Sequence, residues 1–104
     1  MSKSMTITQL QKAIGGIEHR QKTVEGCFYK LSEEVGELAK AIMKDERMLG
    51  NNIKGTIEEE LYDVLYYVVR IANLYNVDLQ QCIMLKEKIN AEKYNRKSFL
   101  EEEK

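Results

Sequence analysis

The chain has 104 residues, of which 43% are hydrophobic and 32% charged, and its 16 Lys and Arg against 17 Asp and Glu leave a net charge of −1. This composition is globular, and the length predicts one domain over residues 1–104. The balanced charge argues against a nucleic-acid partner, which usually requires a basic excess. No apolar run approaches the ~20 residues that span a bilayer, and the first residues lack the apolar core of a signal peptide. We therefore expect a cytoplasmic protein with no membrane partner.

The first half of the chain predicts two helices. An apolar stripe predicts a helix over residues 8–23, within which Gly15 and Gly16 favour a kink or a break. A second stripe predicts a longer helix over residues 24–44. Its apolar members are Leu31, Val35, Leu38 and Ile42. The polar, glycine-containing segment 45–55 then predicts a loop, either a plain connector or a mobile active-site loop.

The second half predicts two more helices. Thr56 and Glu59 fit a capping box, which starts a helix over residues 56–75 that is apolar on most sides. Asp78 and Gln81 fit a second capping box, which starts a helix over residues 78–97. Because no segment shows useful strand alternation or an internal repeat, we expect an all-α bundle of four helices joined by short links.

Four acidic residues lie beside apolar stripes rather than opposite them. Glu34 and Glu37 share one side of the second helix, and Glu60 and Asp63 have the same i, i+3 spacing on the third. Like charges at this spacing repel, and partly buried carboxylates lose hydration. A divalent cation between the two helices would offset both costs, and oxygen-only ligands favour Mg²⁺, with Mn²⁺ also possible. The alternative is an ordinary solvated face that is paired with nearby lysines.

The fourth predicted helix carries groups suited to an anionic substrate, and phosphates are the natural partners of a carboxylate-held metal. Lys86, Asn90, Lys93 and Tyr94 recur at i, i+4, i+7 and i+8 and so share a face. They offer point charges, an amide and an aromatic ring to a nucleotide. The alternative is a basic, solvated helix end that complements the helix dipole.

Together these motifs resemble the MazG-type all-α nucleoside triphosphate pyrophosphohydrolases over roughly residues 31–94. The family pattern of Glu-Glu-x-x-Glu, a loop and Glu-x-x-Asp is present as Glu33-Glu34-Val35-Gly36-Glu37 and Glu60-Leu61-Tyr62-Asp63. The segment from Lys86 to Tyr94 resembles Lys-x-x-x-Asn-x-x-Arg-Tyr, with Lys93 in place of the usual arginine. Lysine keeps the charge but loses the bidentate fork.

The resemblance implies that Glu34, Glu37, Glu60 and Asp63 bind Mg²⁺, that Glu33 and Glu34 are the catalytic carboxylates, and that Lys86, Asn90, Lys93 and Tyr94 contact the nucleotide. The implied reaction cleaves a (d)NTP to a (d)NMP and pyrophosphate, as house-cleaning of nucleotide pools, in a homodimer or homotetramer whose sites are shared between chains. Two alternatives remain open. One is a dedicated dUTPase-like enzyme, and the other is a non-catalytic metal- and nucleotide-binding helical module or sensor.

Overall fold

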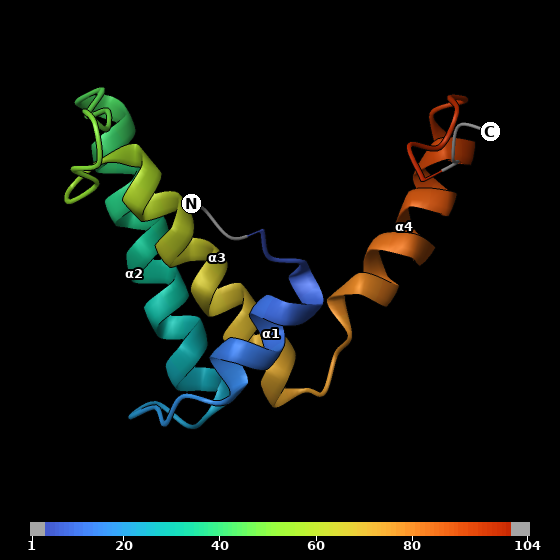
Figure 1. Ribbon diagram of the computed structural model, residues 1–104, viewed down its shortest axis with the longest axis horizontal. Helices are drawn as coiled ribbons and strands as arrows, with labels where there is room; N and C mark the ends of the chain where they lie inside the picture. Colours follow the sequence, from blue (N-terminus) through green and yellow to red (C-terminus); the bar gives the residue numbers. More distant parts are fainter. Residues whose placement is uncertain (1–3, 101–104) are drawn as a thin grey trace.

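The computed structural model describes residues 4–100, and this part of the chain forms four helices and no strand (Figure 1). The helices are α1 (Ile7–Gly15), α2 (Val24–Met43), α3 (Ile57–Leu74) and α4 (Leu79–Lys93). The expected all-α class is therefore confirmed, and the bounds of α2 and α3 lie within about one residue of those predicted. Within residues 4–100, no helix combines the length and the apolar character needed to cross a membrane.

The helices start at polar caps that the sequence carries. The Thr56 and Asp78 side chains accept hydrogen bonds from the backbone N–H groups of Glu59 and Gln81, as the predicted capping boxes require of their first residues. Helix α1 begins at Ile7, one residue before the predicted start at residue 8. Its N-terminus carries a full reciprocal capping box, formed by Thr6 and Gln9. Each of these side chains satisfies an N–H group that has no partner within its helix.

Three helices end in the same way, with an Asx residue in the left-handed region. Asp45, Asn76 and Asn95 have φ values of 52°, 56° and 52° after α2, α3 and α4. In each case the next residue donates its N–H back to a carbonyl of the last turn, as Arg96 does to Ala91 at 2.9 Å. This is the Schellman arrangement, in which asparagine or aspartate replaces the more common glycine.

Two predicted helices are shorter than expected. The first ends at Gly15 rather than residue 23, because two successive glycines favour a break and the Gly16 N–H closes the last turn on Lys12 and Ala13. The fourth ends at Lys93 rather than residue 97, because the left-handed Asn95 turns the chain back. Residues 16–23 therefore form a link at the foot of the fold, and residues 95–100 fold back along α4.

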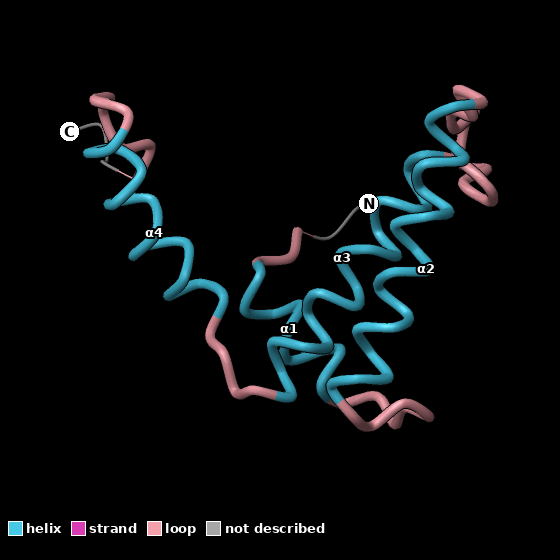
Figure 2. Tube along the Cα trace, turned by 180° about the vertical axis from the view of Figure 1, so that it is seen from behind, coloured by secondary structure: helices cyan, strands magenta, loops and turns pink. Residues whose placement is uncertain are grey.

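The helices form a V-shaped arrangement rather than four parallel rods. Helices α2 and α3 run antiparallel and side by side, α1 packs on the lower half of α3, and α4 leads away to the other side (Figures 1 and 2). The core lies where α1, α2 and α3 meet. Its buried apolar residues are Ile14, Cys27, Ala41, Val69 and Ala72.

Much apolar surface on α3 and α4 is not covered within the described chain. On α3, Leu61 is 53% exposed and Leu65 and Val68 are each 38% exposed. On α4, the side chains of Leu85 and Ile89 are each 58% exposed. Since a small helical domain normally buries such residues, these faces are suited to contact with further helices.

Candidate functional site

Three of the four predicted metal ligands come together between α2 and α3. Glu34 of α2 and Glu60 and Asp63 of α3 each place one carboxylate oxygen within 4.8 Å of the others, and all three residues are half-buried. The antiparallel packing brings the middle of α2 against the first turns of α3, and the i, i+3 spacing turns Glu60 and Asp63 toward the same side. The structure thus gathers carboxylates that are 26 to 29 residues apart in sequence.

These carboxylates are electrostatically unsatisfied. Burial, contact with the Glu34 carboxyl group and the negative charge of Asp63 raise the pKa of Glu60 to about 7. Burial and the charge of Glu34 also raise the pKa of Asp63. The Glu60 Oε1 atom is buried with no hydrogen-bond partner in the described structure. A divalent cation would give this oxygen a partner and would cancel the repulsion, and the all-oxygen donor set fits Mg²⁺.

The three glutamates in the first turn of α3 have different partners. Glu58 accepts a hydrogen bond from the Met48 N–H at 2.9 Å, and Glu59 accepts one from the Gly55 N–H at 2.6 Å. Two of the three glutamates in the first turn of α3 therefore bind the 45–55 loop through hydrogen bonds to its backbone. The third, Glu60, points to α2 instead.

Two further predicted residues lie on the flank of the cluster. Glu37 is exposed, approaches Lys40 at 3.6 Å, and lines a cavity of about 260 Å³ together with Glu60 and the loop residues Glu46 and Gly55. Glu33 is exposed and pairs with Lys30 at 2.9 Å. Both residues share a groove with Glu34, and neither belongs to the group of three gathered carboxylates. Their roles stay predictions.

Three of the four predicted nucleotide contacts lie on α4 and the fourth, Tyr94, is its C-cap residue, and all four lie apart from the carboxylates. Lys86 and Asn90 line one groove of about 270 Å³, and the Lys93 ammonium lies 5.2 Å from the centre of the Tyr94 ring. Because α4 leads away from the α2–α3 pair, a single chain does not bring these residues to Glu34, Glu60 and Asp63 (Figure 2).

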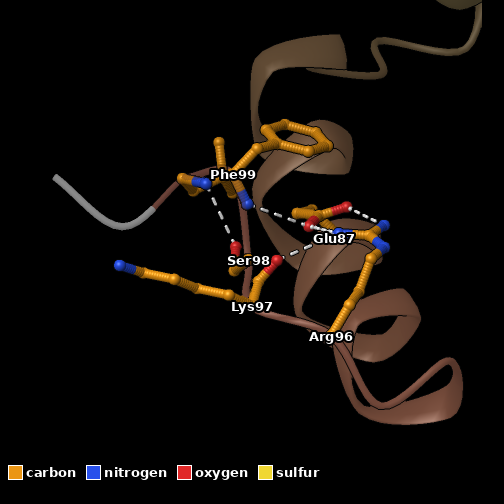
Figure 3. A network of polar contacts seen from close by, with 6 residues as sticks. Glu87, Arg96, Lys97, Ser98 and Phe99 are labelled. Atoms are coloured by element: carbon orange, nitrogen blue, oxygen red, sulfur yellow. Dashed lines mark hydrogen bonds and ion pairs between the residues drawn. The ribbon is translucent and has the colours of Figure 1, made fainter.

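One network at this end was not predicted from the sequence. Glu87 is only 4% exposed, and its carboxylate accepts hydrogen bonds from both terminal nitrogens of the Arg96 guanidinium group (Figure 3). It also accepts a hydrogen bond from the Phe99 N–H at 3.2 Å. The Arg96 hydrogen bond holds the pKa of Glu87 below its ordinary value. Arg96 and Phe99 thereby join Lys86 and Asn90 around the same groove. Only the chain reversal at Asn95 brings Arg96 back to Glu87, so no helical spacing signals this pair.

The raised pKa of Glu60 predicts a pH dependence of stability. Since its pKa of about 7 exceeds the ordinary 4.5, the folded state binds more protons than the unfolded state between these values. The free energy of unfolding of the metal-free protein should therefore fall as pH rises through that window. We expect Mg²⁺ to remove most of this fall, because the cation replaces the proton. Thermal unfolding at both ends of the window checks this, and a slope unchanged in Glu60→Gln would contradict it.

Comparison with known proteins agrees with the motifs. The family profile of the MazG nucleotide pyrophosphohydrolase domain matches residues 22–97. Two crystal structures of iMazG from Vibrio DAT 722 resemble this fold: the Ntag form has a TM-score of 0.78 and 42% identity over 88% of this chain and 100% of its own. The Ctag form has a TM-score of 0.76 and 41% identity over 83% of this chain and 98% of its own. No curated protein matches the sequence. The chain belongs to the MazG nucleotide pyrophosphohydrolase family.

Proposed function

We propose that this protein hydrolyses nucleoside triphosphates, (d)NTPs, to the monophosphate and pyrophosphate with Mg²⁺ as cofactor. The observation that carries this proposal is the cluster of Glu34, Glu60 and Asp63, with its orphaned Glu60 oxygen, in a chain of the MazG family. A purely structural role in salt bridges would not explain the cluster, because no Lys, Arg or His of the described residues pairs with any of the three acids. Mn²⁺ fits the same oxygen donors and should substitute in part.

The residues divide the chemistry between them. Glu34, Glu60 and Asp63 would hold Mg²⁺ with Glu37 on the open side, and the bound ion would neutralise phosphate charge and acidify a water ligand. Glu33 would orient the attacking water and accept its proton as the water oxygen attacks the α-phosphorus. The bond from that phosphorus to the bridging oxygen then breaks, and pyrophosphate leaves with the bridging oxygen and its electron pair.

We propose further that the working form is a homodimer or homotetramer. The predicted nucleotide contacts on α4 lie apart from the carboxylates of their own chain, and α3 and α4 expose apolar side chains such as Leu61 and Leu85. Association of two chains could cover these faces and bring α4 of one chain to the α2–α3 pair of the other. Light scattering that detects only a 12.1 kDa species would contradict this.

The chemistry of the chain and of its substrates bears on the cellular compartment of this reaction. Cys27 and Cys82 are free thiols, which suits a reducing compartment, and the substrates belong to the cytoplasmic nucleotide pool. We propose a cytoplasmic house-cleaning role, in which the enzyme removes unwanted nucleotides, with no nucleic-acid or membrane partner.

Product analysis tests the proposed reaction. The purified protein is incubated with Mg²⁺ and, in turn, with each of the common NTPs and dNTPs and dUTP, and the products are separated by ion-exchange chromatography. We expect a monophosphate and pyrophosphate in equal amounts, and none without a divalent cation. Orthophosphate with a diphosphate would mean that another bond is cut. Turnover of dUTP alone would favour the dedicated dUTPase-like enzyme, and binding without turnover would favour the sensor.

A further inference from the structure

A glutamine of α1 holds the start of α4. The Gln11 side-chain oxygen accepts a hydrogen bond from the Leu79 N–H at 2.8 Å. The nitrogen of the same amide donates one hydrogen bond to the Val77 carbonyl at 2.8 Å and another to the Asn73 side-chain oxygen at 3.0 Å. The amide thus uses both of its N–H donors and its oxygen. It contacts the last turn of α3, the 75–78 link and the first residue of α4 at once.

The position of Gln11 is itself fixed from two sides. The Asn73 side-chain nitrogen donates back to the Gln11 backbone carbonyl at 3.0 Å, so the two residues pair reciprocally. Gln11 also lies one turn before Ile14, which is 2% exposed and belongs to the core where α1, α2 and α3 meet. Gln11 and Asn73 are both half-buried. The anchor to which α4 is attached is therefore part of the packed body of the fold.

This anchor defines the direction of α4 as the local cap cannot. Among the described helices, only α1 makes more than marginal contact with α4 (Figure 2). Asp78 accepts the Gln81 N–H at 3.2 Å, a bond within the first turn that forms whichever way the helix points. The Leu79 N–H has no partner within its helix, and Gln11 reaches it from α1. That bond forms only while the start of α4 lies beside α1.

A small change of direction at this point becomes a large displacement at the other end of α4. The 15 residues of the helix span ~22 Å, so a tilt of ~10° at Leu79 moves Lys93 by ~4 Å. A misplacement of ~1 Å at a reacting centre can cost about 100-fold in rate. In the proposed dimer, this end of α4 has to meet the carboxylate cluster of the other chain. The direction of α4 therefore has to be held closely.

We propose that Gln11 is a positioning residue, which fixes the direction of α4 and so presents Lys86, Asn90 and Lys93 to the nucleotide. This inference rests on the proposed function and its shared site for the role of α4. It gives a part in the reaction to α1, a helix on which no predicted site residue lies. Glutamine suits this role because glutamate, of the same size, would turn a second oxygen toward the two oxygens that the amide nitrogen now contacts.

The direction of α4 can be measured without metal or nucleotide, by pulsed EPR between two spin labels. Lys12→Cys on α1 and Glu92→Cys near the end of α4 place the labels at exposed positions. The exposed native thiol is removed by Cys82→Ser, and Cys27 is fully buried. Labelled chains are diluted with unlabelled ones, so that distances within one chain dominate. We expect one narrow distance in this background, and a shifted or broader distribution once Gln11→Leu is added.

Steady-state kinetics then connects this direction to the reaction. Gln11→Leu nearly preserves size and removes all three side-chain bonds, whereas Gln11→Glu keeps only the acceptor. Both should raise the KM for the nucleotide at least about tenfold. The rise in melting temperature that Mg²⁺ gives without nucleotide should match the wild type, because the carboxylate cluster belongs to α2 and α3. Gln80→Leu, the same change at an exposed glutamine of the first turn of α4, is the matched control and should alter neither quantity.

Two results would overturn the proposal. An unchanged distance distribution in Gln11→Leu would mean that the 75–78 link alone directs α4. A changed distribution with an unchanged KM would mean that the direction does not position the nucleotide contacts. Loss of folding would show itself as lost helicity and lost stabilisation by Mg²⁺. In that case Gln11→Glu, which keeps the bond to the Leu79 N–H, provides the same test in a milder form.

The distance measurement separates this inference from the proposed function. A protein that hydrolyses nucleotides while Gln11→Leu changes neither the distance nor the KM would overturn the positioning role alone. A wild-type protein that hydrolyses no nucleotide would overturn the proposed reaction. The dissociation constant of the nucleotide would then replace KM, and its rise in Gln11→Leu would still support a positioning role for Gln11 in nucleotide binding.

Discussion

Replacing Asp63 by asparagine is expected to lower kcat at least about 100-fold, because metal coordination supplies several kcal/mol of transition-state stabilisation. The same loss is expected for Glu60→Gln, whose oxygen has no other partner in the described structure. Both substitutions preserve side-chain size, so helicity by circular dichroism should stay near the wild-type value. Steady-state assays over a range of Mg²⁺ concentrations measure the effect, and unchanged activity in both variants would refute the metal site.

The metal-free stability of these variants provides a second readout. Burial and the charge of Glu34 raise the pKa of Asp63, so its charged form is disfavoured in the folded protein. Asp63→Asn should therefore raise the melting temperature of the metal-free protein above neutral pH, while it removes the stabilisation that Mg²⁺ gives the wild type. Glu25→Gln, on the first turn of α2, is a matched control outside the cluster. A lower melting temperature for metal-free Asp63→Asn would count against mutual repulsion in the cluster.

The parts of the fold that depend on local chemistry could be predicted from the sequence. Thr56 and Asp78 cap α3 and α4 because a short polar side chain can reach the third backbone N–H group. Asn76 ends α3 for an equally local reason, since asparagine tolerates the left-handed region. The predicted end of α1 is wrong, because the apolar stripe continues to Ile17 whereas the helix ends at Gly15, where two successive glycines favour a break.

The carboxylate cluster could be predicted because its two halves each have a local signature. An i, i+3 pair of acids beside an apolar stripe identifies the side of the helix, and antiparallel packing of neighbouring helices then brings the pairs together. The structure brings Glu34, Glu60 and Asp63 together, and their role as metal ligands stays a prediction. The spacing could not distinguish Glu37, which lies on the same flank but remains exposed.

The contacts of Arg70 and Arg96 depend on tertiary structure and leave no regular spacing in the sequence. Arg70 interrupts an apolar run, which is a signal in itself, but its partner is a backbone carbonyl 49 residues away. The Glu87–Arg96 pair forms only after Asn95 turns the chain back. Nor could helix spacing show that α4 leads away from the carboxylates of its own chain, because the direction of a helix is set by the link before it (Figure 1).

Mixing two inactive variants is expected to restore activity if the site is shared between chains. One variant carries Asp63→Asn in the carboxylate cluster, and the other carries Lys86→Ala and Asn90→Ala on α4. Random exchange in a dimer would make half of the molecules mixed, and each mixed dimer would hold one intact site. About a quarter of the wild-type activity should therefore return at equal concentrations.

A control mixture combines two variants that are both altered in the carboxylate cluster. Asp63→Asn mixed with Glu60→Gln should stay inactive, because both changes fall in the half-site formed by α2 and α3, and no intact combination can arise. Native mass spectrometry of differently tagged chains confirms that exchange has taken place in both mixtures. Exchange without restored activity in the first mixture would contradict a shared site. The carboxylates and the α4 residues of one chain would then have to meet by a movement of α4 about residues 75–78, the link that now directs it away from α3.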